Sequence, residues 1–386
     1  YNLRRKRLQM LEQDLQFVEA AFKKYYFEHF DLLSIPIRAS EREFGYQKFN
    51  GGMNRHISIK SNEELRLMLI TNIPSDVYCS NAYYSFPNLP MSEKDWKGAD
   101  LIFDIDAKDL NLDCRREHTC IKCFSCGEVS VLQSTCPTCK STKIEKKSLT
   151  CKNCIDGAKN EVIKLYSILE EDLDIEKEKI QSYFSGNEGF HVHVTNSQYN
   201  QLGSRERNEL VDYIMFRGAM PETFGMKKSN PERSSFAEID EKGWRGKASK
   251  HIFGSKSKRS KAITEIISNG YSVFQQRLDS LKETIGVKID PNVTIDIHRI
   301  FRLPSSLNSK SGMSKVLCEN IDKFNPFQDS CFIDDEKTNV LANCPTQFTL
   351  KNRKFGPYKN EKVTIPKYAA IYLICKGLAN TTLIQN

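Results

Sequence analysis

Apolar residues recur at helical spacing near the start of the chain, and they predict an amphipathic helix over residues 3–29. Its buried face would carry Leu11, Leu15, Val18, Phe22 and Tyr25. The pattern then shortens to runs that are typical of two strands, over 42–46 and 55–59. The Gly51-Gly52 pair between these runs predicts the turn that joins them.

A second helix is predicted over residues 61–70, because Ser61 can act as the N-cap and Glu64 lies three residues further on. The apolar run over 99–106 is typical of a buried strand that turns polar at its end. The remaining predicted elements are a helix over 161–173, short strands over 181–184 and 190–195, a mainly helical and partly basic stretch over 204–285, and strand-like runs over 293–303 and 363–374. Strands of one sheet are thus separated by inserted modules, which predicts an α/β (α+β) fold with a mixed β-sheet core.

The composition favours a folded protein with a polar surface. Of the 386 residues, 39% are hydrophobic, which is enough to bury a substantial core. No apolar run reaches the roughly 18 residues needed to cross a bilayer, so no membrane association is expected. Residues 1–10 are basic but lack the apolar stretch of a secretory signal, so a soluble intracellular protein is expected. The start at Tyr1 instead of Met suggests a trimmed N-terminus.

The net charge of +8 is compatible with a polyanionic ligand but does not require one. Basic side chains are concentrated over residues 227–233, 242–250 and 256–261. On composition alone, a solvated face and a nucleic-acid contact explain these segments about equally well.

Asp104 and Asp106 lie two positions apart in the predicted strand over 99–106. Both side chains would therefore point to one side of the sheet, while Phe103 and Ile105 point to the core. Two carboxylates held this close repel each other unless a cation lies between them. Such oxygen ligands favour magnesium or manganese, which can bridge the phosphates of a nucleotide. A solvent-facing strand end would have the same spacing, so the pair alone does not decide between the two interpretations.

Eight of the thirteen cysteines fall between Cys114 and Cys154, mostly as Cys-x-x-Cys pairs, and this pattern favours metal thiolates over disulfides. Two such pairs separated by nine residues can form a tetrahedral zinc site, with the ligands Cys123, Cys126, Cys136 and Cys139. A second site could be made by Cys114, His118, Cys151 and Cys154. Cys120 is either a spare thiol or an alternative ligand. Because each set fills four positions, one or two structural zinc ions are expected.

The segment Ser185-Gly186-Asn187-Glu188-Gly189 joins two predicted strands. Glycines let the backbone approach a ligand closely, and the serine hydroxyl and free N–H groups can bond phosphate oxygens. His191 and His193 would share one face of the second strand. The alternative is a hairpin with one buried, hydrogen-bonded histidine.

These features, in this order, resemble the small catalytic subunit of the archaeo-eukaryotic DNA primases, and the archaeal branch in particular. The resemblance extends from Arg42-Glu43-Phe44 to the end of the run Leu373-Ile374-Cys375-Lys376-Gly377. It rests on the Asp-x-Asp strand, the zinc-binding insertion, the Ser-Gly-x-x-Gly-x-His turn and a late aspartate followed by Arg302-Leu303-Pro304-Ser305. It implies a primase catalytic fold over 1–112, 156–203 and 287–386, with a zinc-binding insertion at 113–155 and a basic, mainly helical insertion at 204–286.

The resemblance implies template-directed synthesis of short RNA primers on single-stranded DNA, with two Mg²⁺ or Mn²⁺ ions held by three aspartates. Asp104 and Asp106 match the first two, and of Asp290 and Asp296 the spacing typical of the family selects Asp290 as the third. The residues that it assigns to the incoming nucleotide are Ser185, Gly186, His191 and Lys310, with Glu43 and Arg55 in the same pocket and Arg299 and Arg302 as further candidates for phosphate or template. It also makes the Cys114 set the usual zinc site and the Cys123 set an inserted second ribbon.

Two positions differ from the family's pattern. Family members usually carry a basic residue between the two glycines of the turn, where this chain has Asn187 and Glu188. They also usually carry a histidine where this chain has Asn308. Both differences remove positive charge near the triphosphate, so its binding would depend on His191, Lys310, metals or nearby arginines.

The resemblance also implies a separate large subunit with an iron–sulfur domain, because nothing after Lys376 looks like such a domain. The expected location is the cytoplasm or nucleoid if the protein is archaeal, and the nucleus if it is eukaryotic. Two other functions fit part of the pattern. A repair or translesion primase-polymerase would share the active site, whereas a non-catalytic zinc-ribbon nucleic-acid-binding protein would explain the cysteines and the charge but not the aspartates with the Ser-Gly turn.

Overall fold

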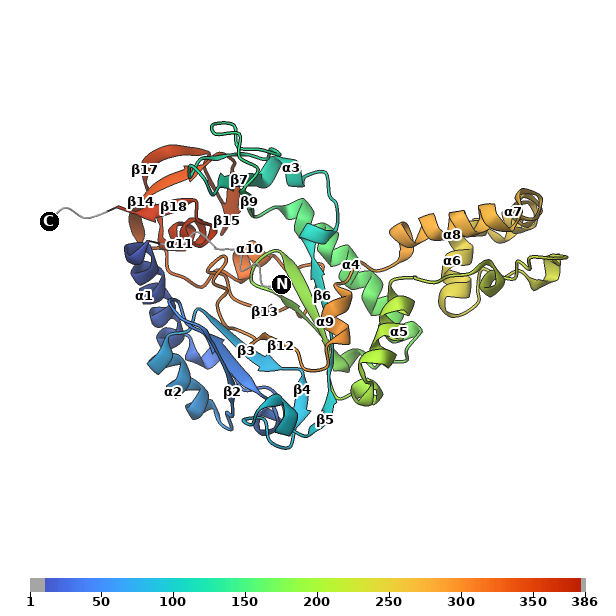
Figure 1. Ribbon diagram of the computed structural model, residues 1–386, viewed down its shortest axis with the longest axis horizontal. Helices are drawn as coiled ribbons and strands as arrows, with labels where there is room; N and C mark the ends of the chain where they lie inside the picture. The colour runs from blue at the N-terminus through green and yellow to red at the C-terminus, as the bar shows by residue number, and fades with distance from the viewer. Residues whose placement is uncertain (1–10, 383–386) are drawn as a thin grey trace.

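Two four-stranded sheets form the centre of the molecule in the computed structural model, which describes residues 11–382 (Figure 1). The first sheet, in the order β12-β3-β1-β2, contains β1 (Phe44–Gln47), β2 (Met53–Ile57), β3 (Asp76–Ser80) and β12 (Ile300–Arg302). The second, in the order β13-β10-β11-β6, contains β6 (Leu101–Asp106), β10 (Ile180–Phe184), β11 (Gly189–Val194) and β13 (Val316–Leu317).

The α/β class is confirmed, but the sheets differ from the predicted mixed arrangement. Every pairing in these two sheets is antiparallel. The strands β1–β2 and β10–β11 are joined by short turns, which permit only antiparallel neighbours. The predicted strands over 42–46, 55–59, 181–184 and 190–195 are present with shifts of a few residues at their ends.

Helices α1 (Glu12–Glu28) and α2 (Asn62–Asn72) lie beside the first sheet (Figure 1). Helix α1 buries Leu15, Val18, Phe22 and Tyr25 as predicted, whereas Leu11 precedes the helix and is exposed. Residues 3–10 of the predicted helix lie outside the described part of the chain. The start of α2 is also confirmed, because the Ser61 hydroxyl accepts a hydrogen bond from the Glu64 amide at 3.3 Å. Helix α4 (Lys152–Glu171) packs against β6 and β11 and begins earlier than predicted, since its first turn carries part of the cysteine motif.

Two late segments correct the strand predictions. The run over 293–303 contains a short helix, α9 (Pro291–Ile295), before β12. Pro291 occupies the first helical position and the Asp290 side chain caps it, which together favour a helix start. The run over 363–374 is a strand only as far as Pro366, the last residue of β17 (Tyr358–Pro366), and then forms α11 (Lys367–Lys376). Helix α11 is buried almost all round, so it lacks the amphipathic pattern that identifies a helix from sequence.

Helix α11 packs against a third sheet, β17-β14-β18, which includes β14 (Lys337–Cys344) and β18 (Ala379–Thr381). The cysteine-rich segment lies close to it at the top of Figure 1. That segment contains α3 (Arg115–His118) and a small sheet in the order β8-β7-β9, made by β7 (Thr119–Cys123), β8 (Val129–Val131) and β9 (Ile144–Ser148). The Lys122 ammonium on β7 donates to the Gly377 carbonyl at 2.8 Å, which ties the small sheet to the end of α11.

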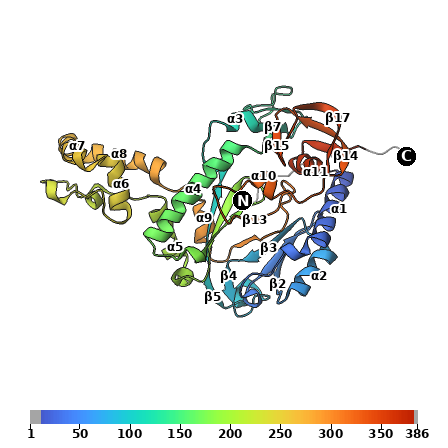
Figure 2. The same cartoon turned by 180° about the vertical axis from the view of Figure 1, so that it is seen from behind.

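A helical arm extends from the body in both views (Figures 1 and 2). It follows α5 (Ser204–Ile214) and contains α6 (Gly243–Phe253), α7 (Lys256–Asn269) and α8 (Tyr271–Ile285). The arm has its own apolar cluster, which includes Phe224, Phe236, Phe253, Ile263 and Phe274. No helix within residues 11–382 is both long and apolar enough to cross a membrane.

Candidate active site and metal centres

Strand β6 carries the two predicted metal-binding aspartates on one face. Phe103 and Ile105 are fully buried on the core side, while Asp104 and Asp106 alternate with them and remain partly exposed. The start of the strand is fixed by Arg207, a fully buried guanidinium that donates to the carbonyls of Ala99 and Asp100 at 2.7 and 3.1 Å. The aspartates therefore project from a strand whose position is determined by core packing.

The free edge of β6 is covered by the segment that contains Asp290. The Asp290 amide donates to the Asp104 carbonyl at 2.9 Å, and the Thr294 hydroxyl donates to the Ile102 carbonyl at 2.8 Å. This pairing brings Asp290 beside Asp104, although the two are far apart in sequence. Asp296 instead accepts from the His298 amide at 2.9 Å, at the far end of α9.

The electrostatics of this face favour a cation. Burial, and then the charges of Asp106 and Asp290, raise the pKa of Asp104 to about 7. Asp104 Oδ1 is buried and has no hydrogen-bond partner among the described residues. Burial lowers the pKa of His191 well below its usual value, and its Nε2 lies 3.5 Å from that oxygen. The Lys108 ammonium forms an ion pair with Asp106, so one positive charge already lies beside the two aspartates.

The Ser-Gly turn lies directly beside the aspartates. Gly189 is opposite Asp106 in the β11–β6 pairing, and a Cβ atom added there would lie 2.5 Å from the Asp106 carboxylate. Gly186 has a φ of +84°, which only glycine adopts without strain. The Asn308 side chain donates to the Ser185 carbonyl at 3.1 Å and accepts from the Lys310 amide at 3.0 Å. It therefore links the turn to the loop between the paired residues Leu307 and Ser314, which we call the Lys310 loop.

The Lys310 loop rests on a buried ion pair between Arg302 and Asp76, with a separation of 2.6 Å. Arg302 also donates to the Leu307 carbonyl at 2.7 Å, and Asp76 accepts from the Ser309 hydroxyl at 2.7 Å. The Arg302 guanidinium is therefore committed to shaping the loop. Arg299, by contrast, has an exposed side chain close enough to Asp104 and His191 to influence the pKa of both.

Glu43 lies beneath Arg55. Its fully buried carboxylate accepts from Arg55 Nε at 2.8 Å, from the His56 amide at 3.2 Å and from Lys94 Nζ at 3.0 Å. Burial would raise the pKa of Glu43, but the hydrogen bonds from Arg55 and Lys94 outweigh it and lower the pKa. Glu43 thus orients Arg55, whose side chain is about one-third exposed at 34%.

Sequence reasoning missed Lys315 as part of this region. Its ammonium is buried and lies 3.0 Å from both His193 Nε2 and the Arg302 carbonyl. Burial lowers the pKa of Lys315 to about 7. No local motif marks this lysine, because its neighbours His193 and Arg302 lie 122 and 13 positions away in sequence.

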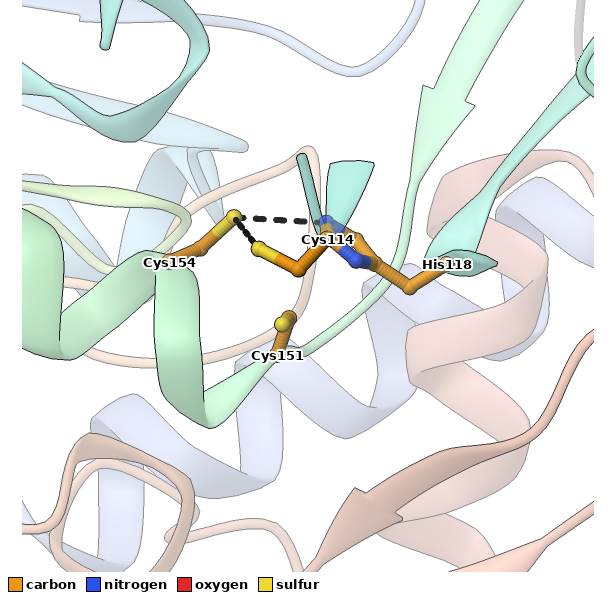
Figure 3. Close-up of side chains that lie close together, drawn as sticks. All are labelled: Cys114, His118, Cys151 and Cys154. Atoms are coloured by element: carbon orange, nitrogen blue, oxygen red, sulfur yellow. Dashed lines mark hydrogen bonds between the residues drawn. The ribbon is translucent and has the colours of Figure 1, made fainter. Parts of the chain in front are cut away.

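Cys114, His118, Cys151 and Cys154 converge at the start of α4 (Figure 3). Their ligand atoms all lie within 4.8 Å of one another. Cys154 Sγ is 3.6 Å from Cys114 Sγ and 3.4 Å from His118 Nε2. The set can hold a metal ion, as predicted.

The second set, Cys123, Cys126, Cys136 and Cys139, meets the same 4.8 Å limit. Its Sγ atoms are 3.6 Å apart for Cys123 and Cys139, and 3.5 Å apart for Cys126 and Cys136. Cys120 belongs to neither set, and its thiol donates to the Lys147 carbonyl at 3.5 Å. Within residues 11–382 these are the only two groups of this compactness, so the three aspartates are more widely spaced.

Comparison with known proteins identifies the family of the chain. The family described as "DNA primase small subunit" matches residues 135–317. The chain is 64% identical to the DNA primase small subunit PriS of Nitrosopumilus maritimus, over 96% of this chain and 99% of that protein. It is 53% identical to the protein of the same name from Cenarchaeum symbiosum, over 96% and 100% of the two chains. The corresponding protein of Archaeoglobus fulgidus is 30% identical over 94% and 98%. With its aspartate face, glycine turn and cysteine sets in the order found here, the chain belongs to the DNA primase small subunit family.

Proposed function

We propose that Asp104, Asp106 and Asp290 bind two divalent cations, Mg²⁺ or Mn²⁺, and that this set is the catalytic centre of the protein. As a DNA primase small subunit, the chain is the catalytic subunit, a nucleotidyltransferase that synthesises RNA primers for DNA replication. The observation that carries the proposal is the buried Asp104 oxygen, which lacks a hydrogen-bond partner among residues 11–382. It belongs to a carboxylate whose pKa is raised by burial and by the charges of Asp106 and Asp290. Such a group is stable as an anion only when a cation neutralises it.

The aspartates and the residues around them have different proposed roles in nucleotidyl transfer. Bound divalent cations supply the charge that stabilises the transferring phosphate and activates the 3′-hydroxyl. The three aspartates fix where that charge lies, and the neutral His191 ring lies 3.5 Å from the buried Asp104 oxygen. No protein nucleophile is required, since the 3′-hydroxyl of one nucleotide attacks the α-phosphate of the next, the bond between its α- and β-phosphates breaks, and pyrophosphate leaves.

The phosphates of the incoming nucleotide are proposed to bind between the Ser185–Gly189 turn and the Lys310 loop. Ser185, Gly186, His191 and Lys310 are the proposed contacts, with Arg299 as a further candidate. Asn308 joins Ser185 to Lys310, and the Ser311 hydroxyl donates to the Gly186 carbonyl, so the turn and the loop meet here. Glu43 contributes by orienting Arg55. Arg302 is proposed to act indirectly, because its ion pair with Asp76 supports the loop.

Both cysteine sets are proposed to hold structural zinc. Two sulfurs bound to zinc at 2.3 Å in a tetrahedron lie roughly 3.8 Å apart, close to the 3.5 and 3.6 Å separations in these sets. Each set offers four ligands, so neither leaves a position for substrate.

The natural partners proposed for the chain are single-stranded DNA, nucleoside triphosphates and a large subunit that carries an iron–sulfur domain. The name "small subunit" in the relatives supports a larger companion chain. Because these relatives are archaeal, we place the protein in the cytoplasm, at the nucleoid.

The test is primer synthesis on a single-stranded template by the Asp104→Ala/Asp106→Ala variant. We expect activity to fall by at least about 10³-fold, the scale typical of losing electrostatic stabilisation of the transition state. Circular dichroism and thermal unfolding should remain those of a folded protein. Metal-dependent synthesis by the folded double variant at more than a tenth of the normal rate would refute the proposal.

A further inference from the structure

The Ser185–Gly189 turn carries an acidic side chain where an anionic ligand is proposed to bind. Glu188 belongs to the turn, and its carbonyl accepts from the Ala107 amide at 3.1 Å, immediately after the aspartate strand. Its carboxylate is 20% exposed and would repel a triphosphate if it were left uncompensated. The turn therefore needs cations from outside its own sequence.

Two cations from distant parts of the chain meet Glu188. Lys376, the last residue of α11, has its ammonium 3.6 Å from Glu188 Oε1. Arg115, the first residue of α3, has Nη1 3.5 Å from Glu188 Oε2. The carboxylate is thus held between opposite charges on its two oxygens.

Lys376 is also bound to the other polar residue of the turn. Its ammonium donates to Asn187 Oδ1 at 2.8 Å, and the side chain is only 7% exposed. The cation lies at the C-terminal end of α11, where the helix dipole favours positive charge. Lys310 lies close enough to oppose the charge of Lys376, so the positive side chains extend from the turn to the Lys310 loop.

Arg115 is fixed by a further contact. Its Nη2 donates to the Ser148 hydroxyl at 2.9 Å, at the end of β9. Because Arg115 lies between Cys114 and His118, the segment that carries these candidate metal ligands also positions the Arg115 guanidinium beside the turn. The two cations therefore come from separate elements that fold around the same carboxylate.

We infer that Lys376 and Arg115 are positioning residues for the nucleoside triphosphate, which neutralise Glu188 and hold it so that the turn can accept phosphate. The inference rests on the proposed function and deepens it. Neither residue is required to touch the reacting atoms. Their effect is on the binding of the nucleotide, because they determine the charge of the turn and the conformation of Asn187 and Glu188.

The test compares Lys376→Met and Arg115→Met in the full chain, each alone and combined with Glu188→Gln. Two quantities are measured: the KM for nucleotide in primer extension, and the affinity for a non-hydrolysable nucleoside triphosphate by calorimetry. Each single substitution should raise KM and Kd about tenfold while changing kcat by less than about threefold. Adding Glu188→Gln should restore most of the loss, since no uncompensated carboxylate remains. Lys24→Met, which removes a lysine from a surface ion pair with Asp334, is the matched control and should change neither quantity.

Rescue by Glu188→Gln distinguishes this role from direct phosphate binding. If the double variants bind nucleotide as weakly as the single ones, the inference is wrong. It is equally wrong if both single variants bind nucleotide normally. Arg115→Met is the safeguard should Lys376→Met fail to fold, because its side chain is 20% exposed. Calorimetry measures nucleotide binding without turnover, whereas the catalytic proposal fails only if the folded Asp104→Ala/Asp106→Ala variant still synthesises primers, so the two failures are distinguishable.

Discussion

Asp290 contributes both a helix cap and a negative charge, and one substitution can remove the charge while keeping the cap. Its side chain caps α9 by accepting from the Asn292 amide at 3.0 Å, and its charge adds to that of Asp104. Asparagine caps a helix about as well as aspartate but carries no charge. We therefore expect Asp290→Asn to abolish primer synthesis while shifting the midpoint of thermal unfolding by no more than a few degrees.

The control for that experiment is Asp296→Asn, because Asp296 lies in the same segment but its carboxylate accepts from the His298 amide instead. This variant should keep primer synthesis within about threefold of the unmodified protein. Primer synthesis is measured alongside calorimetric unfolding. If Asp296→Asn were inactive and Asp290→Asn active, Asp296 would replace Asp290 as the third aspartate.

Glu43 supports Arg55 and Lys94 from a fully buried position, so its loss should destabilise the fold. Glu43→Gln leaves the buried Lys94 ammonium without its counter-charge, and we expect a cost of about 3 kcal/mol in the free energy of unfolding at pH 7. Denaturant titration measures this quantity.

The same residue predicts a pH dependence. The pKa of Glu43 in the folded state lies below its unfolded value of about 4.3. Its stabilising contribution is therefore fully present above that value and is lost as the pH falls through the folded-state pKa. The stability difference between the unmodified protein and Glu43→Gln should shrink in this acid range, and a difference that stayed constant down to pH 3 would contradict the assignment.

The elements that carry the site were partly predictable. Alternation identified β6 and its two aspartates, and capping chemistry identified α2, because both signals are local. Helix α11 was mistaken for a strand since its buried surroundings remove the helical pattern. The link from Lys376 to Asn187 spans 189 positions, so no local pattern could predict which cation compensates Glu188.

The two cysteine sets that could hold zinc differ in burial and in the elements around them, so we predict different consequences when either set is disrupted. Cys154 is buried in the first turn of α4, whereas Cys126 is exposed between β7 and β8 of the small sheet. Cys154→Ser should remove one bound zinc and lower the thermal midpoint substantially, because α4 packs on the catalytic strands. Cys126→Ser should also remove one zinc but leave most of the stability and primer synthesis.

Metal content by mass spectrometry and calorimetric unfolding check both outcomes. A protein that contained one zinc before substitution, or that lost both ions with either change, would contradict two independent structural sites. Cys120→Ser is the matched control, because its thiol lies in neither set and should not alter the zinc content.

At the scale of the whole molecule, the proposed catalytic face is assembled from segments that are separated in sequence by inserted modules. β6, the Ser185–Gly189 turn, Asp290 and the Lys310 loop come together although the cysteine-rich segment and the helical arm lie between them in sequence. The order of motifs predicted the family, whereas the contacts among them depend on tertiary packing. The division at residues 112, 155, 203 and 286 stays a prediction.

The helical arm carries basic segments that lie away from the proposed catalytic face. Lys250, Lys258 and Lys261 are exposed on α6 and α7, and both views show these helices projecting from the body. We expect them to contact the phosphates of the single-stranded template. Replacing all three with alanine should weaken DNA binding and reduce the salt dependence, with a change in the slope of log K against log salt of up to about 2.

The matched control removes three exposed lysines that lie outside the arm: Lys24, Lys354 and Lys362. Both triple variants lose the same net charge, so a general electrostatic attraction would weaken DNA binding equally in the two. Local contact with the template would affect the arm variant alone. Fluorescence anisotropy across a salt series separates these outcomes, and equal slopes for the two variants would show that the arm does not hold the template, since the field of the whole molecule would then account for the affinity.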